Sequence, residues 1–186
     1  MVQKLLSLIE ALPLAGLLAA QVVLPLVGVP VSPIWVATGV RAGALWGTVL
    51  SAGALAVNLS LGYWMARAWL RQPIEAWLRA RGRSVPPISG EDETLWILLV
   101  RATPGIPLFM QNYFLGLAQV RFSRYFFVSF PVQLVYLIAF VSLGHAVKDS
   151  NVWRGLLAVS GLAAAAVAIL LIRRRLDGRW RPPIDK

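Results

Sequence analysis

The middle of residues 94–120 reads LVRATPGIPLF (Leu99–Phe109), and this stretch decides how the chain can fold. Almost all of the segment is apolar, which is typical of a membrane helix. Pro104 and Pro107, however, lie three residues apart, and each proline removes a backbone amide and clashes with the preceding helical turn. A straight helix is therefore excluded, and the sequence predicts two shorter helices joined by a break.

The composition of the whole chain is that of a membrane protein. Of its 186 residues, 58% are hydrophobic and only 14% are charged. A helix needs about 20 apolar residues to cross a bilayer. The stretches that contain no Asp, Glu, Lys or Arg are 11–40, 42–66, 102–120, 125–144 and 155–172. The predicted fold class is therefore an all-α integral membrane protein, a polytopic helical bundle that forms a single domain over residues 1–186.

The formal net charge of +10 does not indicate nucleic-acid binding. The arginines cluster beside the apolar blocks and do not form a basic stripe interleaved with aromatic residues. Basic residues that flank membrane spans are typically cytoplasmic. We therefore place the loop 67–93, Arg121, Arg124 and the C-terminal tail in the cytoplasm, with a last spanning helix at 153–175.

Segment 94–120 then has cytoplasmic charges at both of its ends, so a single crossing would put Arg121 on the wrong side of the membrane. Two half-helices, 94–103 and 108–119, would each rise about 15 Å, which reaches the middle of a hydrocarbon layer about 30 Å thick. The segment is predicted to be a re-entrant hairpin that enters from the cytoplasm. The residues expected at its break are Pro104, Gly105 and Pro107.

Pro30-Val31-Ser32-Pro33 repeats the same pattern earlier in the chain. We expect a first hairpin with its spanning helix over about 25–70, broken at Pro30 and Pro33, and a second such unit over 94–147. The charges predict that the two hairpins open to opposite sides, as in an inverted repeat. Whether residues 4–20 span the membrane or lie along its surface is open.

Arg101 is the main candidate for a functional residue. It lies inside an apolar stretch, where a buried arginine is costly and usually marks a pathway. An anionic substrate could neutralise it, and the planar guanidinium suits phosphate. The alternative is that Arg101 extends back to the cytoplasmic face and pairs with one of three acidic residues. These acids are Glu91, Asp92 and Glu93.

Four uncharged side chains are further candidates for substrate binding: Asn58, Gln111, Asn112 and Tyr113. They could line a hydrophilic cavity, or they could satisfy backbone groups and neighbouring helices. One histidine and no cysteine cannot build a metal centre, and no catalytic set can be proposed. We therefore expect no metal, no cofactor and no enzymatic activity.

The run 99–109, followed by Asn112-Tyr113-Phe114-Leu115-Gly116, resembles the central signature of the DedA/VTT superfamily, in particular its SNARE-associated Golgi-type branch. The resemblance covers roughly residues 25–147. Weaker first-half matches are Pro30 to Pro33, Gly39, Gly43, Gly53 and the ending from Gly62-Tyr63 to Arg67. The resemblance implies opposed re-entrant hairpins and lipid scramblase or flippase activity. In bacterial relatives the implied cargo is phospholipid or polyprenyl phosphate, moved with proton coupling.

The chain differs from this family in the acidic residues of its membrane segments. DedA proper carries a membrane Glu after its first proline pair and an Asp in the next helix, but no acid lies near Pro33, and Asn58 stands about where the Asp would fall. A second family arginine is replaced near Pro107. Carboxylate-mediated proton coupling is therefore not expected, and Arg101 remains the candidate for binding phosphate.

The sequence thus predicts a lipid transporter or scramblase of the bacterial inner membrane, whose partners are anionic phospholipids or polyprenyl phosphates. A non-transporting membrane scaffold or assembly factor is the alternative. The sequence leaves the lipid, the driving force and homo-oligomer formation open.

Overall fold

The computed structural model describes residues 11–83, 88, 93–103 and 106–149. Among these residues it contains helices and no strand. The elements in chain order are α2 (Leu14–Val23), the 3-10 helix η1 (Leu24–Val27), α3 (Ser32–Met65), the π-helix η2 (Ala66–Leu70), α4 (Arg71–Arg79), α5 (Glu93–Ala102), α6 (Leu108–Leu117) and α7 (Phe122–Lys148).

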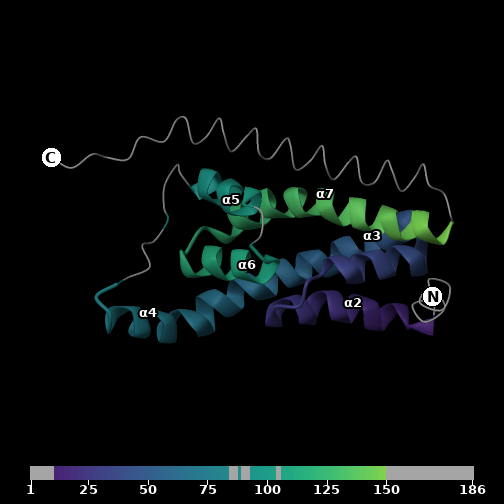
Figure 1. Ribbon diagram of the computed structural model, residues 1–186. Helices are drawn as coiled ribbons and strands as arrows, with labels where there is room; N and C mark the ends of the chain where they lie inside the picture. Colours follow the sequence, from purple (N-terminus) through teal and green to yellow (C-terminus); the bar gives the residue numbers. More distant parts are fainter. Residues whose placement is uncertain (1–10, 84–87, 89–92, 104–105, 150–186) are drawn as a thin grey trace.

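The break expected near residue 104 is present. Helix α5 ends at Ala102 and α6 begins at Leu108, so the two expected half-helices are confirmed. Pro107 is the N-cap of α6, with an extended ψ of 149°. The amide of Ile88, five residues before α5, donates to the carbonyl of Ala118 at the end of α6 at 2.9 Å. The two helices therefore fold back on each other (Figure 1). The other expected break residues, Pro104 and Gly105, lie outside the described residues.

Helix α3 reverses its direction at Gly43. This residue has φ 77° and ψ −179°, a conformation that is open to glycine and strained for other residues. A Cβ added to Gly47 would lie 3.3 Å from the carbonyl oxygen of Thr38. In one straight helix these residues would be far apart, because each residue adds about 1.5 Å of rise. Helix α3 is therefore two antiparallel arms, before and after Gly43.

The first half of the chain differs from the sequence prediction in two respects. Helix α2 begins at Leu14, before the start near residue 25 that the sequence suggested for the first unit. Pro33 does not lie in the break. It occupies the first turn of α3, where a missing amide costs nothing because that amide would have no helical partner. The break itself lies between Val27 and Ser32 and includes Pro30.

The segment expected as the loop 67–93 is helical in its first half, where it forms η2 and α4. The local cause is an ion pair one turn apart, since Nε of Arg71 lies 2.5 Å from Oε1 of Glu75. Ile74 and Leu78 lie on the same side of the helix, and both are half-buried. In Figure 1, α4 extends beyond the packed helices at the end where α5 begins and α6 ends. We call this end of the bundle the α4 end.

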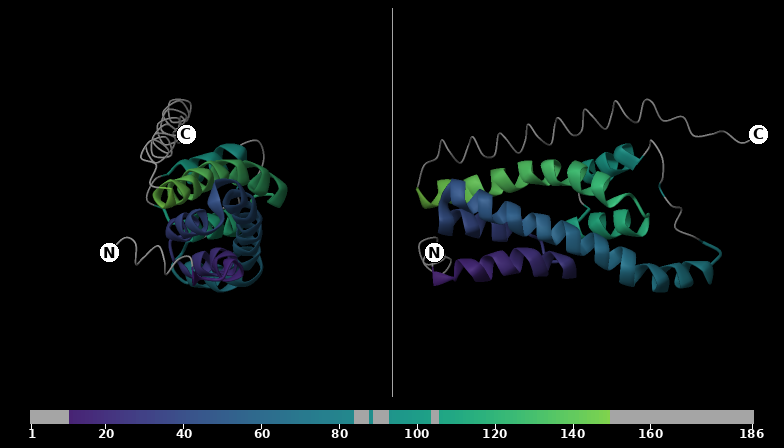
Figure 2. Two further views of the ribbon diagram at one scale, coloured as in Figure 1. Left: turned by 90° about the vertical axis from the view of Figure 1, so that its right-hand side faces the viewer. Right: turned by 180° about the vertical axis from the view of Figure 1, so that it is seen from behind.

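The opposite end is the Gly43 end. Nε of Arg41 lies 3.4 Å from the carbonyl oxygen of Leu12, which brings the start of α2 to the reversal in α3. A Cβ on Gly43 would lie 4.0 Å from Nδ1 of His145, so the last turn of α7 is also at this end. Viewed end-on, α3 lies between α2 and α7 (Figure 2).

Two glycines allow α3 and α7 to pack with their backbones in contact. A Cβ on Gly39 of α3 would overlap the carbonyl oxygen of Val141, and a Cβ on Gly144 of α7 would overlap that of Val36. The two contacts are reciprocal, because each helix presents a glycine to a carbonyl of the other. Small residues at helix interfaces permit this close approach in membranes.

Two described helices are long and apolar enough to cross a membrane: Ser32–Arg79 and Phe122–Lys148. Because the first of them reverses at Gly43, the part able to cross is the arm after that residue. The expected spanning helix at 153–175 and most of residues 4–13 lie outside the described residues. From Leu14, the segment 4–20 belongs to a shorter apolar helix that continues to Val27.

Candidate functional site

Arg101 lies near the end of α5 and is only 3% exposed. Its guanidinium donates three hydrogen bonds, each to an uncharged side chain. Nε binds Oγ of Ser129 at 2.9 Å, Nη1 binds Oε1 of Gln111 at 3.0 Å, and Nη2 binds Oδ1 of Asn112 at 2.8 Å. The guanidinium carbon also lies 5.3 Å from the centre of the Tyr125 ring, in the geometry of a cation–π contact.

The charge of Arg101 is not neutralised by any acid in the part of the chain that the structure describes. The one acid of α5, Glu93, is directed elsewhere: its carboxylate oxygens lie 3.7 Å from Nε of Arg121 and 3.2 Å from Nη1 of Arg124. Glu91 and Asp92 lie outside the described residues. The alternative in which Arg101 pairs with Glu93 is therefore wrong.

Helices α6 and α7 bring the partners of Arg101 together. Gln111 and Asn112 are adjacent on α6, in the first helical turns after the break. Ser129 and Gln133 lie one turn apart on α7, so both face the same side, and Nε2 of Gln133 is 3.5 Å from Oε1 of Gln111. Sequence reasoning missed these two α7 residues. Their spacing of four residues inside an otherwise apolar span was the signal that could have revealed them.

Asn58 lies close to this cluster without bonding to it. Its Nδ2 donates to the carbonyl of Val22 in α2 at 2.8 Å, while its buried Oδ1 has no hydrogen-bond partner. One helical turn after Asn58, a Cβ added to Gly62 would lie 3.1 Å from Nδ2 of Asn112. This Nδ2 is also buried and has no hydrogen-bond partner. The absence of a side chain at Gly62 thus leaves room for Asn112 beside the turn that holds Asn58.

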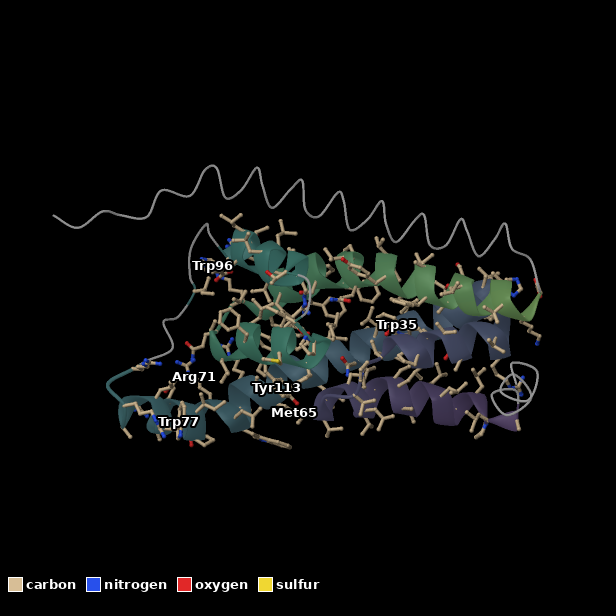
Figure 3. All side chains as sticks on the ribbon, viewed as in Figure 1. Trp35, Met65, Arg71, Trp77, Trp96 and Tyr113 are labelled. Atoms are coloured by element: carbon tan, nitrogen blue, oxygen red, sulfur yellow. The ribbon has the colours of Figure 1, made fainter. Side chains whose placement is uncertain are left out.

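Tyr113 does not contact Arg101. Its hydroxyl donates to the carbonyl of Leu26 at 2.6 Å and so ties α6 to η1 (Figure 3). A second buried polar contact lies in the first half of the chain, where Nε2 of Gln21 donates to Oγ1 of Thr38 at 2.7 Å. Of the five predicted binding residues, the structure therefore joins Arg101, Gln111 and Asn112, and leaves the other two beside them.

The two breaks in the helices meet at one pocket of about 330 Å³. It is lined by Gly28–Ser32 from the first break and by Ile106–Phe109 from the second. Nε2 of Gln111 donates to the carbonyl of Ile106 at 3.0 Å, and the Oε1 of the same side chain accepts from Arg101. One glutamine side chain therefore connects the pocket lining to the buried arginine.

The VTT domain matches residues 29–146, which is more than half of the chain. The chain belongs to the VTT domain family. The resemblance found in the sequence is thus confirmed, and this VTT protein is a helical membrane protein. No curated protein and no solved structure matches it.

The chemistry of the VTT site is that of a cation surrounded by neutral hydrogen-bonding groups. Among the residues that the structure describes, no group of three or more His, Cys, Asp or Glu side chains could hold a metal ion. The side chains around Arg101 are amides, a hydroxyl and a phenol ring. Such groups can hold and orient an anion.

Proposed function

We propose that this VTT protein moves anionic lipids, phospholipid or polyprenyl phosphate, across the membrane as a transporter or scramblase without acting as an enzyme. The observation that carries the proposal is the meeting of the two helix breaks at one pocket, which the Gln111 side chain connects to the buried Arg101. Broken helices expose polar backbone groups, which are tolerated at membrane depth where they line a cavity. A lipid headgroup could pass there while its acyl chains remain in the bilayer.

The arrangement of the two halves supports re-entrant hairpins that enter from opposite sides, as in an inverted repeat. The first hairpin begins at the Gly43 end, and the second begins at the α4 end. Each hairpin also packs against the long helix of the other half. Gly39 of the first packs on Val141 of α7, and Gly116 of the second packs on Tyr63 of α3. Paired broken helices in an inverted repeat are typical of transport sites.

Two helix N-termini lie at the pocket, that of α3 at Ser32 and that of α6 at Leu108. Neither has a side-chain cap. In α3, Pro33 has no amide and the amide of Ile34 donates to the carbonyl of Val31, so the α6 terminus offers more uncapped amides. The N-terminus of a helix carries a partial positive charge and favours anions. This polarity supports an anionic headgroup in preference to a cationic one.

Arg101 adds a full positive charge one side chain away from the pocket lining, since Gln111 contacts both. Its three hydrogen bonds to neutral side chains orient the guanidinium without neutralising it. Because the side chain is covered, a phosphate must displace at least one of these partners. Gln111 is the candidate, since it also contacts the pocket lining at Ile106. The displacement would then couple headgroup binding in the pocket to release of the arginine.

The test is lipid movement in reconstituted vesicles that contain a fluorescent phospholipid. We expect Arg101→Gln to lower the rate at least about tenfold, because the buried charge that binds phosphate is lost. Arg101→Lys should retain partial activity, since it keeps the charge but loses the two-point geometry. Arg41→Gln is the matched control, because Arg41 is exposed at the Gly43 end, and it should behave as the wild type.

A stable Arg101→Gln protein with undiminished lipid movement would contradict the proposed role of Arg101. If the wild type moved no lipid at all, the scaffold alternative would take its place.

A further inference from the structure

Helix α4 presents an apolar face to its surroundings. Trp69, just before the helix, is 74% exposed, and Trp77 is 57% exposed. No residue of α4 is buried. The other exposed apolar residues of this face follow at helical spacing: Pro73, Ala76 and Ala80. Large exposed aromatic groups gathered on one helix mark an interaction surface.

The more covered side of α4 carries an ion pair beside the half-buried Ile74 and Leu78. Arg71 and Glu75 form an ion pair in which each side chain is 22% exposed. In a helix packed on a water-soluble protein, the apolar residues would face inward and the charges outward. The two tryptophans on the exposed side of α4 and the ion pair on its covered side depart from this pattern, and they fit an outer face that meets the membrane interface.

The apolar face of α4 continues the outer side of α3. Val57 is 48% exposed, Leu61 is 42% exposed and Trp64 is 50% exposed. These residues precede Trp69 at helical spacing, on the arm of α3 that is able to cross a membrane. The same medium that covers α3 therefore reaches α4, and tryptophans at this point fit the boundary between acyl chains and headgroups.

Arginines surround the far end of this surface. Between Ala66 and Arg83 the chain has five arginines and a single acid, Glu75. Three of them, Arg79, Arg81 and Arg83, are exposed at or just beyond the end of α4. The guanidinium of Arg81 lies 3.8 Å from the centre of the Trp77 ring, so an aromatic and a cationic group share one patch. Basic clusters beside a membrane span attract anionic lipids.

We propose that α4 docks on the surface of the bilayer at a layer of anionic phospholipids. Trp69 and Trp77 lie at the level of the headgroups, and Arg79, Arg81 and Arg83 bind the lipid phosphates. This surface is separate from the pocket between the breaks, so its existence does not depend on lipid movement by Arg101.

The chain has no cysteine, which permits a clean probe of this surface. A fluorophore on Ala76→Cys would report from the exposed side of α4. In nanodiscs with an equal mixture of phosphatidylglycerol and phosphatidylcholine, we expect strong quenching by a lipid spin-labelled at its headgroup. In phosphatidylcholine alone, quenching by a water-soluble agent should rise roughly twofold or more, because the electrostatic attraction is lost.

Two sets of variants separate the contribution of the arginines to membrane docking from that of the tryptophans. Replacing Arg79, Arg81 and Arg83 together by Gln should remove the difference between the two lipid compositions while the lipid quencher still reaches the probe. Replacing Trp69 and Trp77 by Ser should reduce quenching by lipid in both compositions. Correct folding of each variant is checked by thermal unfolding in detergent, since none of these side chains is buried.

Equal quenching by the aqueous agent in both compositions would overturn the proposal. Efficient disulfide formation between Ala76→Cys chains in the nanodisc would also overturn it, because the face would then be the contact between two copies of the chain.

Discussion

Arg101 shows how a cation can be kept inside a membrane protein without an acid beside it. Its partners on α6 and α7 are Gln111, Asn112 and Ser129, which accept hydrogen bonds but carry no charge. A carboxylate at the same distance would neutralise the guanidinium and would compete with any anionic ligand. The neutral partners therefore leave the charge of Arg101 available.

This reasoning leads to a prediction for Asn112→Asp. The new carboxylate would take the place of Oδ1, which is 2.8 Å from Nη2 of Arg101, and would form a buried ion pair. We expect a higher melting temperature, because the arginine gains a charged partner, and lipid movement slower by about tenfold or more, because a phosphate must now displace that partner. Thermal unfolding and vesicle assays measure the two effects. Asn112→Ser, which keeps a neutral acceptor, is the control, and equal activity of the two variants would count against the prediction.

At the scale of the helices, glycine decides which pairs can touch. Gly39 and Gly144 bring the backbones of α3 and α7 into contact, and a methyl group at either position would overlap a carbonyl oxygen of the other helix. Such contacts fix the position of the first arm of α3 against α7. The helix breaks can meet at one pocket only if this packing holds.

Gly39→Ala should therefore destabilise the protein by roughly 2 kcal/mol or more, because backbone atoms cannot move aside as a flexible side chain can. Gly53→Ala is the matched control: its added Cβ has nothing within 4 Å, and alanine favours the helix by about 0.5–1 kcal/mol. Thermal unfolding in detergent compares the two variants. A Gly39→Ala protein as stable as Gly53→Ala would show that α3 and α7 do not pack as described.

For the whole molecule, the two ends of the bundle differ in how many basic residues lie there. The α4 end holds the arginines of η2, of α4 and of the start of α7, while the Gly43 end holds Arg41 and Lys148. The larger number of arginines predicts that the α4 end is cytoplasmic.

This orientation is testable with single cysteines, since the natural chain has none. Leu12 lies at the Gly43 end and is 46% exposed. In intact cells, an impermeant thiol reagent should therefore label Leu12→Cys. The same reagent should leave Ser84→Cys unlabelled until the cells are opened. The reverse pattern would invert the proposed orientation, and labelling of both positions would rule out hairpins that enter from opposite sides.

The amino-acid sequence by itself determined the properties that depend on local chemistry. The helix break near Pro104 and Pro107, with α5 ending at Ala102 and α6 beginning at Leu108, follows from the missing amides of proline. The membrane character follows from several apolar runs that are long enough to cross a bilayer. Helix α4 was missed because its arginines were read as a cytoplasmic loop, although the pairing of Arg71 with Glu75 one turn later is also local.

Only the tertiary structure decided which groups meet. The reversal at Gly43 depends on a glycine that could equally have continued a helix, and packing between the two arms of α3 selects the turn. Arg101 finds Ser129, 28 residues away in the chain, because α5 and α7 lie side by side. A sequence pattern indicates that a buried charge needs partners. Which partners it receives depends on the positions of helices that are distant in the sequence, and those positions follow from the shapes that fit together in the core.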